Sequence, residues 1–359
     1  MSVEPLEELA GQARRDRVAV HLVWDGMLLA AAIVMAVLVY NRDSSALSGD
    51  GLRNQLVAAT ASLLLATAVA VSLRAAVPNL AVGSIATAAG VLVGVLSTQE
   101  QLTLGAATGV TAGAGAAVGL LLGVVVAGLR APAWAASLAA VAMLGAAAVG
   151  LSGGSGVLLT EGPDLLRWPW PLFLGAVAIS VAGGAVALAP RPRAALGAFR
   201  PSGDPAGRRG LRGNSVAITV LVLSSLLATA GGLVAVFRLK AALPGASALE
   251  TTTLTAVGAA LLGGVSVHGR RGGVFGTALA VVTIQLLLLW FALGNYPVWT
   301  AQVVAGGAIV IGLVVSRIVE GLGTPREPEP GPPDADDQDI SPPPWAQPEY
   351  ETAYYQPDR

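Results

Sequence analysis

The sequence predicts an all-α, polytopic transmembrane bundle of about ten helices. Hydrophobic residues make up 54% of the 359 residues and charged residues only 12%, about half the roughly 25% charge of an average soluble protein. The apolar residues gather in runs of about 20, the length that a helix needs to cross the hydrocarbon core. The chain also carries 45 glycines, and small residues let transmembrane helices approach closely. This composition excludes a disordered chain or a soluble secreted protein.

Ten apolar segments are expected to cross or enter the membrane as helices, because a backbone in hydrocarbon must satisfy its own hydrogen bonds. They are residues 22–40, 54–73, 78–98, 102–129, 132–153, 169–190, 215–237, 251–268, 273–294 and 298–318. Pro78, Pro132 and Pro171 lie at span starts, where a missing N–H costs nothing. Segments 78–98 and 251–268 are short and rich in glycine and small polar residues, which predicts broken or re-entrant helices.

Arginine placement predicts that both termini are cytoplasmic. With the N-terminus inside, fourteen arginines fall on the cytoplasmic side and five basic residues fall outside, as the positive-inside rule requires. The opposite orientation would expose the six arginines of residues 191–212 to the exterior. We therefore expect a multi-pass protein of the cell membrane, in contact with membrane lipid.

Polar segments frame this membrane body. Residues 1–21 are expected to be cytoplasmic, either as a short amphipathic helix at the membrane surface or as a frayed tail. Residues 22–320 form the membrane domain, with a cytoplasmic loop at 191–214. Residues 321–359 hold ten prolines and nine acidic residues, a composition that predicts disorder. The run from Ser341 to Trp345 is either a polyproline ligand for a partner or a solvated linker.

Several classes of chemistry are excluded by what the chain lacks. It has no cysteine and only two histidines, so disulfides and thiolate metal sites are absent. We expect no catalytic residue and no metal ligand, and the chain is not expected to be an enzyme. Its charge is not clustered as nucleic-acid binding requires. Ion-driven carriers usually need an acid within the membrane, and only Asp25 lies near a span end.

Neutral polar residues within the spans favour an uncharged polar solute over an ion. The candidate pathway residues are Asn79, Ser84, Thr283 and Gln285. For any single one of them, a hydrogen bond between helices or to the preceding turn is the plainer interpretation.

Glycines in segment 102–129 form two stripes, about 200° apart around a helix. One stripe contains Gly105, Gly109 and Gly113, and the other contains Gly115, Gly119 and Gly123. The pattern predicts an interior helix that neighbours grip closely on two sides.

Residues 262–277 form the most informative stretch. Its fixed positions are Leu262, Gly263, Gly264, Ser266, Gly269, Gly272, Gly276 and Thr277. No strand precedes it and no G-K-[ST] follows, so it is not a phosphate-binding loop. Glycines permit turns and close backbone approach, which favours a hinge between two helix halves.

This stretch resembles the permease subunits of ABC importers for monosaccharides such as ribose and xylose. Their pattern L-G-G-x-S-x-x-G-x-x-G-x-x-x-G-T is met at every fixed position. Residues 119–134 are similar to the family's G-x-x-x-G-x-x-x-A-x-x-x-[VA]-P-x-[FW] run, and residues 80–84 (L-A-V-G-S) to its L-S-V-G-S. The resemblance covers about residues 54–320.

The resemblance implies a path formed by two permease chains, either two copies or a pair of different chains. Two ATP-binding subunits would hold ATP and Mg²⁺, so this chain itself binds no cofactor, and an extracytoplasmic solute-binding protein would deliver the sugar. The coupling loop that docks on the ATPase would correspond to Gly203, Asp204, Pro205, Ala206 and Gly207, where relatives resemble G-N-E-A-A. Pro205 and Gly207 depart from the relatives' pattern and are unfavourable in the interior of a coupling helix.

Other departures concern the cargo. Relatives have Asp where Asn79 stands, and Glu and Asp where Thr253 and Thr255 stand. The first hypothesis is thus an ATP-driven importer permease for a neutral polar solute, with a monosaccharide favoured. A permease of the same superfamily for branched-chain amino acids or nucleosides, a permease-like scaffold with a drifted coupling loop, and a secondary transporter remain as alternatives.

Overall fold

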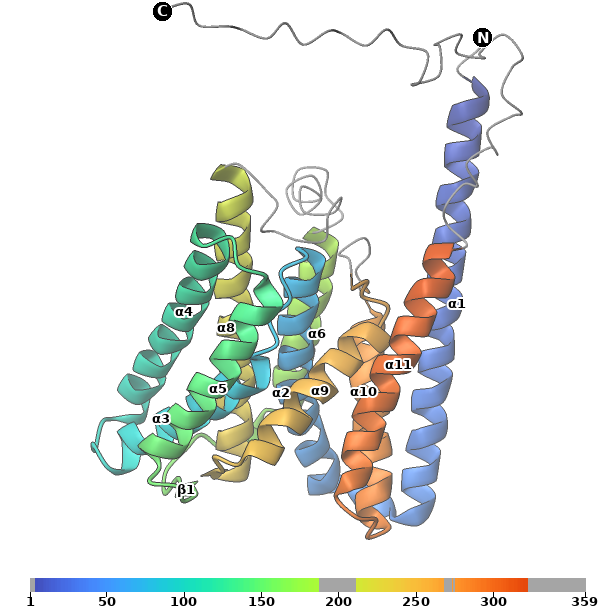
Figure 1. Ribbon diagram of the computed structural model, residues 1–359. Helices are drawn as coiled ribbons and strands as arrows, with labels where there is room; N and C mark the ends of the chain where they lie inside the picture. The colour runs from blue at the N-terminus through green and yellow to red at the C-terminus, as the bar shows by residue number, and fades with distance from the viewer. Residues whose placement is uncertain (1–3, 187–210, 268–272, 274, 322–359) are drawn as a thin grey trace, which may run out of the picture.

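A computed structural model describes residues 4–186, 211–267, 273 and 275–321, which form a helical bundle (Figure 1). The helices are α1 (Glu4–Arg42), α2 (Gly49–Arg74), α3 (Val82–Thr98), α4 (Leu104–Gly128), α5 (Ala133–Leu151), α6 (Pro169–Val186), α8 (Leu211–Leu239), α9 (Ala246–Leu262), α10 (Gly276–Leu293) and α11 (Trp299–Gly321). Two short 3-10 helices, η1 (Ser44–Leu47) and η2 (Leu165–Arg167), lie in the connections. Strands β1 (Val157–Leu158) and β2 (Ala241–Ala242) pair antiparallel.

Each of the ten predicted segments corresponds to one helix, which confirms the all-α, polytopic fold class. Within the described residues, seven helices are long and apolar enough to cross a membrane, and three apolar helices are shorter. The segments predicted to be broken or re-entrant contain α3 and α9, each only 17 residues long. α6 is described from Pro169 to Val186, and residues 187–190 of its predicted segment lie outside the described residues.

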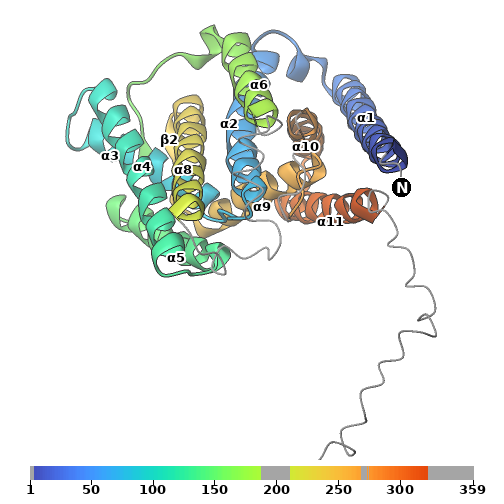
Figure 2. The same cartoon turned by 90° about the horizontal axis from the view of Figure 1, so that it is seen from above.

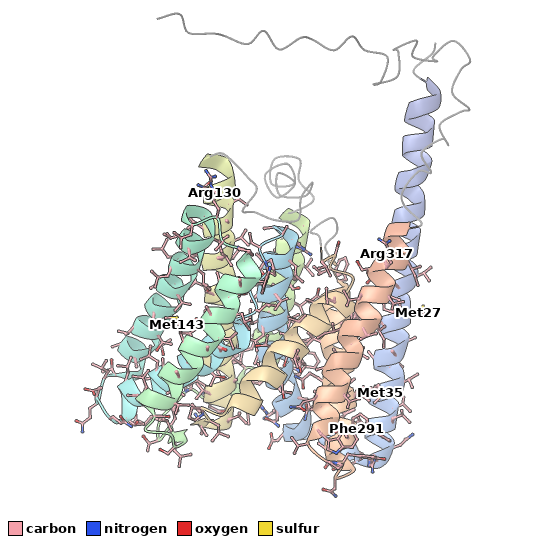
Figure 3. The ribbon with its side chains drawn as sticks, viewed as in Figure 1. Met27, Met35, Arg130, Met143, Phe291 and Arg317 are labelled. Carbon is pink, nitrogen blue, oxygen red and sulfur yellow. The ribbon has the colours of Figure 1, made fainter. Side chains whose placement is uncertain are left out.

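The first and the last helix of the membrane body have their chain ends at the same end of the bundle. Figure 1 shows that α1 begins, α2 ends and α11 ends at one end of the bundle, which we call the inner end. Arg130 and Arg317 also lie at this end, whereas Phe291 lies at the opposite, outer end (Figure 3). The positions of these two arginines agree with the orientation that the arginine distribution predicts.

Helix α1 is longer than a membrane span. It contains 39 residues, about 58 Å at 1.5 Å per residue, against a hydrocarbon core of roughly 30 Å. Pro5 lies in the first turn, where proline is tolerated, and no proline follows within the helix. Residues 4–21 are therefore a helical extension of the first span, and Figure 1 shows them projecting beyond the bundle.

The core is built around α2. Figure 2 shows α2 enclosed by α6, α8, α9 and α10, and Leu63, Ala66 and Val69 on it are almost completely buried. By contrast, large apolar side chains on α1 and α5, such as Met27 and Met143, are exposed and point outward (Figure 3). Exposed apolar faces of this kind are what lipid hydrocarbon surrounds.

The connection between α1 and α2 is capped by Asp43. The Ser45 backbone N–H and hydroxyl donate to its carboxylate at 2.9 Å and 2.6 Å. These two hydrogen bonds hold the pKa of Asp43 below its usual value. The cap is therefore fully present above the ordinary carboxyl pKa and is lost as the pH falls through the lowered one.

The two glycine stripes of α4 have different surroundings. A Cβ on Gly119 would lie 2.6 Å from the Cα of Val222 on α8, and one on Gly123 would lie 2.6 Å from the Cα of Ile218. Gly105, Gly109 and Gly113 have no such neighbour within 4 Å among the described residues. The prediction of close neighbours on both sides is thus wrong within the described chain, because α4 lies at the bundle's edge (Figure 2).

Gly119→Ala should therefore destabilise the protein where Gly109→Ala does not. The added methyl group of Gly119→Ala meets the backbone of α8, and overpacking of this kind typically costs about 1–3 kcal/mol. Gly109→Ala removes only a helix-weakening glycine and is expected to be neutral or slightly stabilising. Thermal unfolding of both variants in the same detergent tests this difference. Equal melting temperatures would show that α4 and α8 are not in close contact.

Candidate functional site

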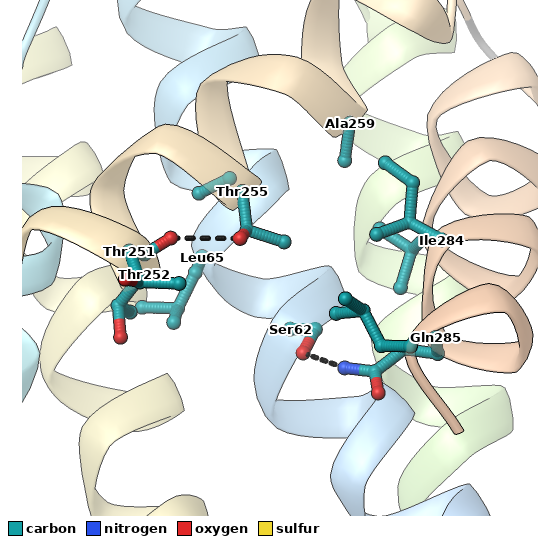
Figure 4. A pocket seen from close by; sticks show the side chains of 11 residues that line it. Ser62, Leu65, Thr251, Thr252, Thr255, Ala259, Ile284 and Gln285 are labelled. Carbon is teal, nitrogen blue, oxygen red and sulfur yellow. Dashed lines mark hydrogen bonds between the residues drawn. The ribbon is translucent and has the colours of Figure 1, made fainter. Parts of the chain in front are cut away.

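A cavity of about 180 Å³ lies between α2, α9 and α10 (Figure 4). Its wall is formed by Ser62, Leu65, Thr251, Thr252, Thr255, Ala256, Ala259, Val281, Ile284, Gln285 and Leu288. Ser62 and Gln285 occupy central positions in α2 and α10, so the cavity lies midway between the ends of the bundle.

The polar groups of the cavity are hydroxyls and one amide. The Gln285 side-chain amide donates to the Ser62 hydroxyl and thereby joins α10 to α2. The Thr255 hydroxyl donates to the Thr251 carbonyl at 2.7 Å, as Figure 4 shows. Thr255 is a helix-surface neighbour of both Thr251 (i, i+4) and Thr252 (i, i+3), and all three line the cavity from α9.

Among the residues whose side chains the structure describes, those on the cavity wall are all uncharged. A neutral, hydroxyl-bearing wall can exchange hydrogen bonds with a neutral polar solute but offers no counter-charge to an ion. It is suited to holding a solute without carrying out covalent chemistry.

Of the four predicted pathway residues, the structure places only Gln285 on the cavity wall. The Asn79 side chain donates to the Ser224 hydroxyl at 3.1 Å and accepts from the Ala81 N–H at 3.1 Å. It therefore holds the turn that precedes α3. The Thr283 hydroxyl donates to the Leu279 carbonyl at 2.8 Å and lies 3.4 Å from the Leu28 carbonyl of α1, so it faces α1.

Ser84 is fully buried, and its hydroxyl has no hydrogen-bond partner within the described part of the chain. It lies on α3, whereas the cavity wall comes from α2, α9 and α10.

Sequence reasoning did not select Ser62, Thr251 or Thr252, and it noted Thr255 only as a departure from relatives. The run Thr251-Thr252-Thr253-Leu254-Thr255 in an otherwise apolar helix was a usable signal, because it places several hydroxyls on one helix face. Ser62 could not have been found in this way. Its role depends on Gln285, which is 223 positions away along the chain.

The glycine motif forms a break between α9 and α10. α9 ends at Leu262, and Gly264 has a φ of +85°, a conformation that residues with a side chain rarely adopt. A Cβ on Gly263 would lie 2.7 Å from the carbonyl carbon of Gly276. A Cβ on Gly273 would meet the Gly263 carbonyl. The motif thus requires glycine because two backbone segments touch directly.

The remaining motif residues are placed as follows. Ser266 is almost completely buried, and the Asp25 carboxylate of α1 lies beside Gly276. Gly269 and Gly272 lie outside the described residues.

Side chains from two other helices reach this break. The indole Nε1 of Trp24 on α1 donates to the Leu262 carbonyl at 2.8 Å. The guanidinium of Arg74, at the end of α2, donates to the Gly273 carbonyl at 3.1 Å. The break is therefore tied to α1 and α2 near the inner end of the bundle.

The predicted coupling loop, Gly203, Asp204, Pro205, Ala206 and Gly207, lies outside the described residues, as does the tail beyond Gly321. Within the described chain, no group of three or more His, Cys, Asp and Glu residues is arranged to hold a metal ion.

The chain is similar to two curated transport proteins over most of its length. It is 26% identical to the ribose import permease protein RbsC of Escherichia coli over 272 residues, 72% of this chain and 83% of the relative. It is 28% identical to the L-arabinose ABC transporter permease protein AraH of Azospirillum brasilense over 248 residues, 67% and 71% of the two chains.

No protein-family model matches the chain, and no solved structure matches it. The two alignments nevertheless cover most of the chain, and seven of its described helices are long and apolar enough to cross a membrane. These findings identify the chain as a multi-pass membrane protein homologous to ABC permeases for sugars.

Proposed function

We propose that the chain is the membrane-spanning permease subunit of an ATP-driven ABC importer and forms the path for a neutral polar solute, with a monosaccharide favoured. The observation that carries the proposal is the cavity at the centre of a bundle related to ribose and arabinose permeases, whose described wall is uncharged and combines apolar side chains with hydroxyls and an amide. Its hydroxyl and amide groups can exchange hydrogen bonds with the hydroxyls of a sugar. The chain supplies no covalent chemistry in this role.

The proposed role requires partners. A second permease chain would complete the path, and two ATP-binding subunits would bind ATP and Mg²⁺ at the inner end. An extracytoplasmic solute-binding protein would deliver the sugar. Coupling is assigned to Gly203, Asp204, Pro205, Ala206 and Gly207, within the arginine-rich segment 191–214. The six arginines of this segment favour a cytoplasmic position for it, because positive residues are more frequent in cytoplasmic loops.

Uptake in proteoliposomes tests the function. The chain would be reconstituted with its ATP-binding subunit and solute-binding protein, and radiolabelled D-ribose would be the probe. We expect that ribose uptake requires ATP. L-arabinose should inhibit this uptake by competition, whereas leucine and uridine should not. A catalytically inactive ATP-binding subunit is the matched control.

Three results would contradict the proposal in different ways. Uptake that survives ATP removal and collapses with an uncoupler would indicate a secondary transporter. Competition by leucine or uridine alone would indicate another cargo of the same superfamily. Failure to assemble with any ATP-binding subunit would favour a permease-like scaffold.

A further inference from the structure

The cavity between α2, α9 and α10 has polar and aliphatic groups in different parts of its wall. The polar side chains are those of Ser62, Thr251, Thr252, Thr255 and Gln285. The aliphatic side chains are those of Leu65, Ala256, Ala259, Val281, Ile284 and Leu288. Figure 4 shows Ala259 and Ile284 on one side of the cavity, away from the pair formed by Ser62 and Gln285. The two kinds of group are therefore not mixed evenly.

On α2 and α10 the aliphatic groups lie nearer the inner end of the bundle. α2 ends at the inner end (Figure 1), so Leu65 lies about 4.5 Å further inward than Ser62 at 1.5 Å per residue. α10 runs in the opposite direction, because Phe291 lies at the outer end (Figure 3). Val281 therefore lies about 6 Å further inward than Gln285.

α9 shows the same order. It ends at the glycine break near the inner end, and Ala256 and Ala259 follow Thr255 in that direction. Leu288 is the exception among the described wall residues, because it lies on the outer side of Gln285. The hydroxyls and the amide thus face the outer part of the cavity, and aliphatic side chains form its inner part.

The inner part is closed and the outer part is open. Leu65, Ala256, Ala259, Val281 and Ile284 are each at most 6% exposed, and we call them the closed end. The remaining wall residues are partly exposed, and together they form the open end, which consists of Ser62, Thr251, Thr252, Thr255, Gln285 and Leu288. A solute that enters through the open end therefore has its leading part enclosed by aliphatic side chains.

The two ends make opposite demands on a solute. Hydroxyls and an amide can both donate to and accept from the hydroxyls of a sugar. The described side chains of the closed end offer no hydrogen-bonding group. A solute hydroxyl enclosed there would lose its bonds to water without replacement, which lowers affinity by roughly five- to a hundredfold. A methyl group in the same place gains by leaving water.

We propose that the cavity selects a sugar with a methyl group at one end, namely a 6-deoxyhexose in preference to the hexose that carries a hydroxyl at C6. Val281 and Ile284 are the specificity-determining residues, because they line the closed end from α10. Ribose in its six-membered ring has no exocyclic carbon and remains acceptable. The proposal rests on the proposed function, because it treats the cavity as the solute site, and it names the class of monosaccharide.

Protection of a single cysteine measures this preference on the chain alone. The chain has no cysteine, so Ser62→Cys places one thiol at the open end. Methyl methanethiosulfonate, a small neutral reagent, would modify this thiol in detergent, and the sugar concentration that halves the rate would be measured. The sugars are pairs that differ only at C6, namely 6-deoxy-D-galactose with D-galactose, 6-deoxy-D-glucose with D-glucose, and L-rhamnose with L-mannose. In each pair that protects, we expect the deoxy sugar to act at a concentration about ten times lower.

Threonine substitutions test whether the closed end causes the preference. Val281→Thr adds a hydroxyl there at almost unchanged volume. This hydroxyl can donate to a carbonyl of the preceding turn and still accept from a solute hydroxyl. We expect it to reduce the preference to about threefold or less, and Ile284→Thr should act in the same direction. Leu288→Thr on the same helix is the matched control at the open end and should leave the preference unchanged.

Melting temperatures and the labelling rate without sugar show whether each variant keeps its fold. The proposal is refuted if paired sugars protect equally, if no sugar protects, or if Leu288→Thr changes the preference as much as Val281→Thr does. These readouts need neither ATP nor a partner. ATP-driven uptake of ribose without a deoxy preference would reject this inference and leave the proposed function standing. A deoxy preference without ATP-driven uptake would reject the transport role and leave the selectivity of the cavity standing.

Discussion

Gly263→Ala is expected to abolish solute uptake and to leave little folded protein. The φ of Gly263 is −69°, which alanine adopts readily, so the substitution introduces no backbone strain of its own. Its methyl group would instead lie 2.7 Å from the carbonyl carbon of Gly276. Backbone atoms cannot rotate away as a flexible side chain can. The start of α10 must move as a whole, and the cavity wall that α10 provides would move with it.

The cost should reach or exceed the upper part of the roughly 1–3 kcal/mol that overpacking usually causes. Thermal unfolding in detergent and uptake of radiolabelled ribose measure the two consequences. Gly306→Ala on α11 is the matched control, because a Cβ there has no neighbour within 4 Å in the described chain. It should keep full uptake and gain slightly in stability. A Gly263→Ala protein as stable and active as Gly306→Ala would show that the backbone crossing is not tight.

The break illustrates how far the sequence could predict the structure. Hydropathy located the ten α-helices of the described chain, and the glycine spacing located the break between α9 and α10, because both signals are local. The glycine spacing in α4, however, predicted a close neighbour on both stripes, and this was wrong within the described chain. Gly109 and Gly119 are indistinguishable by pattern, yet only Gly119 meets a neighbouring helix. Which face of a helix is covered depends on where that helix lies in the bundle, and sequence periodicity does not contain this information.

The cavity was harder to predict for a related reason. Neutral polar residues in transmembrane helices serve both as packing contacts and as solute contacts. Asn79 and Gln285 both carry a neutral side-chain amide. Asn79 holds a turn, whereas Gln285 faces a cavity. The distinction lies in their partners, Ser224 and Ser62, which are far away in the sequence. The structure therefore adds mainly the long-range pairings.

Gln285→Leu is expected to weaken solute uptake by about ten- to a hundredfold while leaving the fold intact. Leucine removes the one amide that the described residues place on the cavity wall. A solute hydroxyl left without a partner costs about 1–3 kcal/mol, and about 1.4 kcal/mol corresponds to tenfold in affinity. The loss should appear mainly as a higher KM for ribose uptake. The Ser62 hydroxyl, which also loses its partner, can turn toward a carbonyl of the preceding turn of α2, as the Thr60 hydroxyl does.

The neighbouring position Thr283 offers the control that makes this result interpretable. Thr283→Val removes a polar group from the same helix, but that hydroxyl bonds to the Leu279 carbonyl and lies outside the cavity wall. Its KM should match that of the unaltered chain. If both variants lose uptake equally, polarity along α10 matters only for packing, and the hydroxyl-lined cavity is not where the solute binds. If only Gln285→Leu loses uptake, the path of the solute runs between α2, α9 and α10.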